Sequence, residues 1–186
     1  NGDGLNEGYS RVALGQQSTP NLIDSVLISD NYNNSSRDQK TFNVNYRYDN
    51  GKGTSLNIDG DYGTYSNSSN RYLPNQYFNE SEDLLLSELI NTFDTPTDID
   101  IYTVKVDYEH DLWGGKVGVG TKMSQVVSDN TFLVNDVIDG ISVQNNEQSN
   151  IFKYDEMVYA AYVSYLRPIN DKWSFTAGLR AEQTDL

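Results

Sequence analysis

The 186-residue sequence contains no cysteine, which excludes disulfides, thiolate nucleophiles and zinc–thiolate sites. Basic residues are also scarce, since 13 Lys and Arg stand against 27 Asp and Glu, for a formal net charge of −14. Nucleic-acid binding needs clustered cations to contact phosphates, so this class of partner is excluded as well. No apolar run reaches the roughly 18 residues of a transmembrane helix, but the strands of a transmembrane barrel alternate and are polar on average.

Aromatic residues are abundant by contrast. The chain has 14 Tyr and 14 Gly but only four Pro, a composition typical of β-structure. Its length is sufficient for one domain with a buried core. It does not begin with Met and shows no secretory signal segment, so we expect a mature fragment or an excised segment of a longer chain.

A two-residue period is the main pattern of the sequence. From Trp173 to Glu182 the odd positions are apolar and the even positions are small, polar or charged. This pattern predicts a strand with one apolar and one polar face. The same alternation predicts three hairpins, over residues 40–65, 98–128 and 152–184. The fold class is therefore an all-β, antiparallel up-and-down meander of about six strands over residues 39–186, after a loop-rich N-terminal segment, 1–38.

The connections between these strands alternate in length. Residues 50–53, 112–115 and 168–172 form short turns, and Asn50-Gly51 is a strong hairpin signal. Residues 66–97 and 129–150 form long links. In an up-and-down sheet all short turns then lie at one edge, as in outer-membrane barrels.

The first long link carries a helix signal. Asn79 is a suitable N-cap with Glu82 three residues later, and four apolar residues follow at helical spacing: Leu86, Leu89, Ile90 and Phe93. We expect a short amphipathic helix here, either a packed loop element or a partner-binding helix.

The alternation assigns side chains to faces, except in the strand over 152–166, where both faces are partly apolar. The apolar or lipid-facing side of the sheet is predicted to carry Val104, Val106, Val117, Val119, Phe175 and Leu179. Aromatics near the short turns suit a membrane interface, because each has an apolar body and a polar tip: Tyr48, Tyr108, Trp113, Tyr165 and Trp173. The opposite face carries charges that suit a wet lumen or the solvent side of a soluble sheet: Arg47, Lys105, Lys122, Arg180 and Glu182.

Three runs of this sequence resemble the outer-membrane β-barrel family of TonB-dependent-receptor type: residues 94–109, 153–162 and 177–182. The similarity covers roughly Asp38 to Leu186. It implies a barrel segment of a bacterial outer-membrane receptor that imports a scarce nutrient and is energised from the inner membrane. We find no plug domain and no energy-coupling box, and six strands are fewer than the eight of the smallest membrane barrels. The full import activity therefore requires further parts of the protein.

Residue patterns for chemistry are weak. Residues 57–61 have some features of a calcium loop, but strand alternation explains them more simply. His110 is the single histidine and is expected to be solvated rather than a metal ligand or base. The carboxylates Glu80, Glu82 and Asp83 suit a helix start as well as an acid/base pair. We therefore expect no enzyme, no cofactor and no metal site.

Two functions remain open. The first is the transporter segment, with outer-membrane lipid, the rest of the barrel and plug, and an inner-membrane energising complex as partners. The second is a soluble all-β sandwich that binds carbohydrate or another ligand, with its apolar face covered by a second sheet. In either case the isolated segment is expected to self-associate through its open edges and apolar face. The sequence does not encode the ligand.

Overall fold

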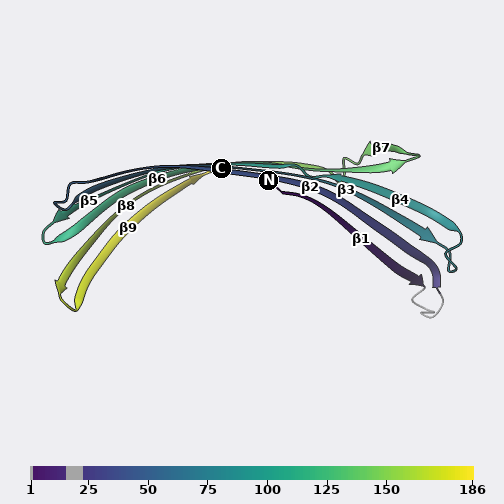
Figure 1. Ribbon diagram of the computed structural model, residues 1–186, viewed down its shortest axis with the longest axis horizontal. Helices are drawn as coiled ribbons and strands as arrows, with labels where there is room; N and C mark the ends of the chain where they lie inside the picture. Colours follow the sequence, from purple (N-terminus) through teal and green to yellow (C-terminus); the bar gives the residue numbers. More distant parts are fainter. Residues whose placement is uncertain (1, 16–22) are drawn as a thin grey trace. The chain divides into compact units, whose positions relative to one another are not determined.

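A computed structural model describes residues 2–15 and 23–186 of the chain. They form a nine-stranded antiparallel sheet with the strand order β1-β2-β3-β4-β6-β8-β9, in which β5 pairs with β3 and β6, and β7 pairs with β6 (Figure 1). This confirms the all-β meander, with more strands than the six expected. The strands are β1 (Gly2–Gly15), β2 (Ile23–Asp49), β3 (Thr54–Phe78), β4 (Leu85–Asp94), β5 (Thr97–Leu112), β6 (Gly115–Ile138), β7 (Ile141–Gln144), β8 (Asn150–Asn170) and β9 (Trp173–Asp185).

The chain divides into two compact units, and several strands contribute to both. Unit 1 comprises residues 1–38, 66–98 and 129–152. Unit 2 comprises residues 39–65, 99–128 and 153–186. The three predicted hairpins supply most of unit 2, whereas unit 1 contains the N-terminal segment and the two predicted long links.

All three short turns belong to unit 2, and their backbone explains their sequences. Trp113 (φ 50°) and Gly114 (φ 72°) both take positive φ, as a two-residue turn that follows the strand twist requires. In the turn between β2 and β3, Gly51 and Gly53 have positive φ, and the side-chain oxygen of Asn50 accepts the N–H of Thr54 at 3.0 Å. The three short connections are thus confirmed, and in the structure they comprise residues 50–53, 113–114 and 171–172.

The register of β8 and β9 settles which faces these strands present. Val163 lies directly opposite Leu179, and Tyr162 lies directly opposite Arg180. Because directly opposed side chains share a face, one side of this hairpin is apolar and the other is polar and aromatic. The ambiguity of the strand over 152–166 is resolved in favour of Val163 on the apolar face.

The expectation of mainly loop over residues 1–38 is wrong for the part described. β1 pairs with β2 over a continuous register from Gly2↔Arg37 to Leu14↔Ser25. Over β1 and residues 29–38 of β2 most side chains are polar, so this stretch lacks the alternation that marks a half-buried strand. The expected apolar run Leu22–Leu27 begins in residues 16–22, outside the described residues; its Val26 is fully buried.

The expected helix after Asn79 is also wrong. Asn79 does act as a cap, because its side-chain oxygen accepts the N–H groups of Asp83 and Leu84, each at 3.1 Å. Glu82, however, has a φ of 61°, which turns the chain back instead of continuing a helix. The apolar residues that follow enter β4, which is paired with β3 on one side and β6 on the other, so sheet pairing overrides the helical spacing.

The two long links are largely strand. β3 continues through Phe78 and β4 returns, so residues 66–97 form a second hairpin. β6 continues to Ile138, and a turn at Asp139 and Gly140 (φ 52° and 77°) leads into β7. The strands therefore extend well beyond the alternating segments that identified them.

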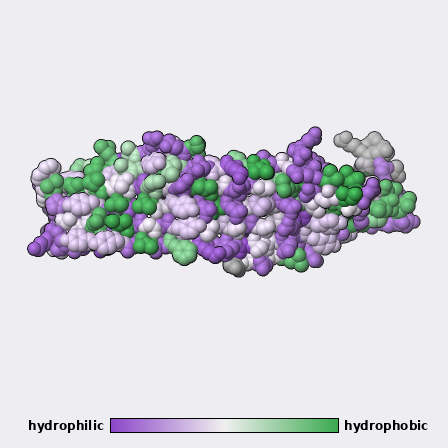
Figure 2. All heavy atoms as spheres, turned by 90° about the horizontal axis from the view of Figure 1, so that it is seen from above, coloured by the Kyte–Doolittle hydropathy of each residue, from purple (hydrophilic) through white to green (hydrophobic). Residues whose placement is uncertain are grey.

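The sheet has little core. The buried apolar side chains of the described residues are Val26, Val134 and Ala160. Figure 2 shows one face of the molecule, on which hydrophobic side chains stand at the surface beside hydrophilic ones. A single layer leaves its apolar side chains uncovered, so they need a cover from outside the chain.

Candidate functional site

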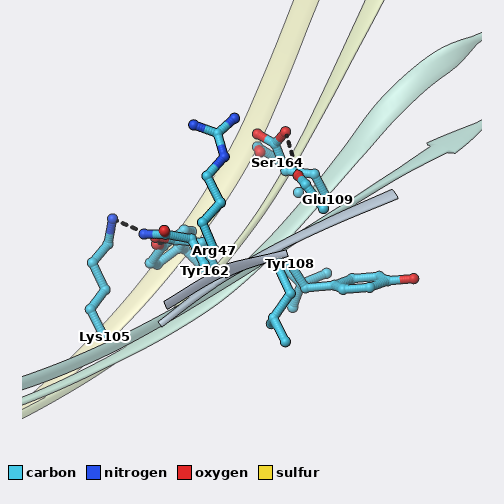
Figure 3. A pocket seen from close by; sticks show the side chains of 12 residues that line it. Arg47, Lys105, Tyr108, Glu109, Tyr162 and Ser164 are labelled. Carbon is cyan, nitrogen blue, oxygen red and sulfur yellow. Dashed lines mark hydrogen bonds and ion pairs between the residues drawn. The ribbon is translucent and has the colours of Figure 1, made fainter. Parts of the chain in front are cut away.

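The polar face of unit 2 carries a hollow of about 490 Å³ that is lined by residues of β2, β3, β5, β6 and β8. Alternation along each strand brings its polar side chains to this face. Figure 3 shows that the side chains of several strands gather on one side of the ribbon, whereas the ring of Tyr108 points away. The labelled residues on the gathered side are Arg47, Lys105, Glu109, Tyr162 and Ser164.

The centre of this face is a charge network across β5, β8 and β9. The Lys105 ammonium forms an ion pair with Asp107 at 2.7 Å, and the Tyr162 hydroxyl donates a hydrogen bond to the same carboxylate. The Arg180 guanidinium lies 6.0 Å from the centre of the Tyr162 ring and forms an ion pair with Glu182. Each ion pair thus lies along one strand, Lys105–Asp107 on β5 and Arg180–Glu182 on β9, and Tyr162 of β8 contacts both pairs.

Two glycines of β6 make room for these side chains. A Cβ built at Gly120 would overlap the Tyr162 ring, and one at Gly118 would lie 2.8 Å from the Ser164 hydroxyl oxygen. Tyr162 therefore lies across β6 at Gly120 and reaches Asp107 on the far side. Only a residue without a side chain leaves space for this close approach.

An amide–carboxylate ladder extends the polar face over β2 and β3. Asn43 donates to Asp61 at 2.6 Å, and Asn45 donates to Asp59 at 2.5 Å and to Asn57 at 3.0 Å. The side-chain oxygens of residues 57–61, which had some features of a calcium loop, thus accept hydrogen bonds from asparagine amides of β2. Among the described residues no group of three or more His, Cys, Asp or Glu side chains is placed to hold a metal ion.

The opposite face of unit 2 is apolar and aromatic. Tyr62 stacks between Phe42 and Tyr102, with ring centres 6.3 and 5.0 Å away. The predicted apolar positions range from half-buried (Val106 and Val117) to exposed, with 79% of Leu179 accessible. The exposed ones are Val104, Val119, Phe175 and Leu179.

The predicted interfacial aromatics lie beside the short turns. Trp113 and Trp173 are 78% and 70% exposed, and the Tyr165 hydroxyl donates to the backbone oxygen of Trp113 at 3.1 Å. Tyr48 is the second-last residue of β2, and Tyr108 stacks on His110 with ring centres 6.3 Å apart. His110 also contacts the Thr54 hydroxyl at 2.8 Å.

The predicted lumen charges are brought together only in part. Lys105, Arg180 and Glu182 belong to the network, and Arg47 lines the hollow. Lys122 lies on β6 outside the hollow. Sequence reasoning missed Tyr162 as the connecting residue, because both faces of its strand looked semi-apolar. The two small residues at Gly118 and Gly120, on the polar side of β6, were the available signal.

No helix of the described residues is long and apolar enough to cross a membrane. The comparison with curated proteins finds no match to the chain. The sequence profile of the outer membrane protein beta-barrel family matches residues 49–186, which include the polar network and all of unit 2 except residues 39–48. The two-faced antiparallel sheet and this match together show that the chain belongs to the outer membrane protein beta-barrel family, whose members are located in the bacterial outer membrane.

Proposed function

We propose that this chain is part of the barrel wall of a TonB-dependent receptor that imports a scarce nutrient. The observation that carries the proposal is the length of the strands beyond the short turns. β2 has 27 residues, β3 has 25 and β6 has 24, whereas a tilted strand needs about 9–11 residues to cross the hydrocarbon. Strands of this length have many residues beyond those needed to cross the hydrocarbon, and these additional residues can hold a ligand before it enters the barrel.

The proposal gives each unit a role. Unit 2 crosses the membrane, with its apolar face toward lipid and its polar network toward the lumen, and its short turns lie on the periplasmic side. Unit 1 contains the strand ends beyond the membrane and the turns at Glu82 and Asp139, which we place at the external surface. Ligand capture belongs to unit 1, and passage belongs to the lumen beside unit 2.

The role is non-enzymatic and needs no cofactor of its own. Its partners are outer-membrane lipid, the remaining barrel strands and plug, and an inner-membrane energising complex that acts through those other parts. Nucleic acid is not a partner. We also propose that the isolated segment self-associates, because Leu179, Trp113 and the other exposed apolar side chains have no cover within the described residues. A monomeric segment in light scattering would contradict this last point.

The import proposal is tested in the intact protein. A strain that lacks the gene is first screened for a growth defect on limiting nutrients, and uptake of the nutrient so identified is then measured. Collapse of the proton gradient should abolish uptake and leave binding to the cell surface unchanged. Uptake that persists without the gradient would indicate passive passage through a pore and would contradict energised import.

A further inference from the structure

Unit 1 has a hollow of its own, of about 420 Å³, which none of the functions above assigns. Two aromatic rings form part of its wall: Tyr32 of β2 and Tyr72 of β3 lie with ring centres 6.2 Å apart and planes inclined by 36°. Leu5 of β1 adds an apolar side chain. The rings are 43% and 40% exposed, so a ligand in the hollow can reach them.

The polar part of the same hollow contains a carboxylate without a partner. Asp94 lies directly opposite Asn70 in the β3–β4 register, and Thr92 lies opposite Tyr72, so these four side chains share one face. Among residues 2–15 and 23–186, the Asp94 carboxylate and the Asn70 amide make no side-chain hydrogen bond or ion pair. The partly buried Asp94 carboxylate, which lines the hollow together with two aromatic rings, can therefore still accept hydrogen bonds from a ligand.

Arg71 is the one cationic residue of the lining, but its charge is engaged elsewhere. Its Nε donates to the Asn31 side-chain oxygen at 2.5 Å, and its guanidinium lies 5.8 Å from the centre of the Phe93 ring. Neither Asn31 nor Phe93 lines the hollow. Among the described residues, this guanidinium and the Asp94 carboxylate form no ion pair with each other.

The charge of unit 1 adds to this local picture. Its residues include 15 Asp and Glu but only three Arg and no Lys, a formal charge of −12. Unit 2 includes 12 acidic and 10 basic residues, a formal charge of −2. Nearly all of the net charge of the chain thus lies in unit 1, where it raises the local concentration of cations and speeds their association.

We propose that the hollow of unit 1 binds an organic cation, an amine that is protonated at neutral pH, with its charge between the Asp94 carboxylate and the faces of Tyr32 and Tyr72. Ring faces attract cations through their quadrupole, and a carboxylate supplies the opposite charge and a hydrogen-bond acceptor. The assignment goes beyond the proposed import role: Tyr32 and Tyr72 lie ten residues along β2 and β3 from Phe42 and Tyr62, so they share the face that this role assigns to lipid and not the one toward the lumen. Binding itself requires no transport.

The test uses the intact barrel protein in detergent, titrated calorimetrically with spermidine and, separately, with the neutral sugar maltotriose. Spermidine should bind saturably and more weakly as salt is added. Asp94→Asn should lower the affinity about tenfold, since a lost charge-assisted contact is worth that much. Tyr72→Leu should lower it as well. Asp139→Asn is the matched control: it removes one charge from unit 1 at a turn outside the hollow, where Asn tolerates the positive φ, and should change the affinity less than twofold.

Three outcomes of the titrations would overturn the inference. Equal effects of Asp94→Asn and Asp139→Asn would mean that only the diffuse charge attracts spermidine. Binding of maltotriose without spermidine would assign the rings to a sugar, and binding of neither would remove the site. A heat-dependent shift in gel mobility confirms that each variant is folded. If spermidine does not bind but uptake still depends on the proton gradient, this inference alone is contradicted. If spermidine binds but uptake persists without the gradient, the import role alone is contradicted.

Discussion

The substitution Val106→Arg tests whether the apolar face of unit 2 contacts lipid. Val106 lies on β5 between Lys105 and Asp107, which form an ion pair on the polar face, so its own side chain points to the other side. An arginine at this position cannot reach the lumen without turning the strand over.

The expected cost follows from the position of Val106 along the strand. Seven residues separate it from Trp113 at the short turn. At roughly 3.3 Å per residue and a tilt near 40°, this corresponds to about 18 Å of height above the interface that Trp113 marks. Half the hydrocarbon thickness is about 15 Å, so Val106 lies close to the midplane. Arginine there should lower the free energy of unfolding by about 2–4 kcal/mol.

The assay is reversible unfolding of the intact barrel protein from lipid vesicles in denaturant, with the folded fraction read from gel mobility without boiling. Ser164→Arg is the matched control, because Ser164 lines the hollow on the polar face and an added cation there remains in water. It should cost less than about 1 kcal/mol. Equal costs for the two variants, or a Val106→Arg cost below about 1 kcal/mol, would refute the lipid-facing assignment.

Two further predictions concern close packing and a turn. Gly120→Ala should lower the free energy of unfolding by about 1–3 kcal/mol through overlap with the Tyr162 ring, and should cost much less in a Tyr162→Ala background. Gly60→Ala is the control, because a Cβ at Gly60 has no neighbour closer than 3.9 Å. Additive effects of Gly120→Ala and Tyr162→Ala in the double variant would contradict the contact. The pKa of Asp83 is lowered mainly because the Asn79 amide donates to its carboxylate. A lowered pKa stabilises the 79–84 turn above the ordinary carboxyl range, near pH 4, and this stabilisation is lost as the pH falls through the lowered value. Hydrogen exchange of the Leu84 amide should show less protection at pH 3 than at pH 6, after correction for the intrinsic pH dependence of exchange, and unchanged corrected protection would contradict it.

The sequence predicted unit 2 far better than unit 1, because the two units differ in how apolar and polar side chains are distributed between the faces of their strands. In unit 2 one face is apolar and the other polar, so strands such as Trp173–Asp185 show a two-residue period. In unit 1, β1 and residues 29–38 of β2 show no sustained alternation of apolar and polar residues, and only backbone pairing such as Gly4↔Ser35 defines the strands. That pairing is a long-range property, which local composition does not reveal.

The helix prediction failed for a related reason. Asn79 caps a turn as the sequence suggested, but in β4 the apolar residues at helical spacing are divided between the two faces, Leu86 and Ile90 on one and Leu89 and Phe93 on the other. Backbone pairing of β4 with β3 on one side and β6 on the other favours the strand over the helix. Tyr162 was missed because its role depends on Gly120 and Asp107, which lie on two other strands.

The most direct test of a membrane-spanning unit 2 is a scan of β8 by single nitroxide labels. Cysteines introduced one at a time from Ala161 to Tyr165 in the intact protein in lipid vesicles are labelled, and their accessibility to oxygen, which concentrates in lipid, is compared with that to a water-soluble nickel complex. The account predicts a two-residue alternation, with oxygen favoured at Val163 and the nickel complex favoured at Tyr162 and Ser164. Equal accessibility to the nickel complex along the whole strand would contradict it.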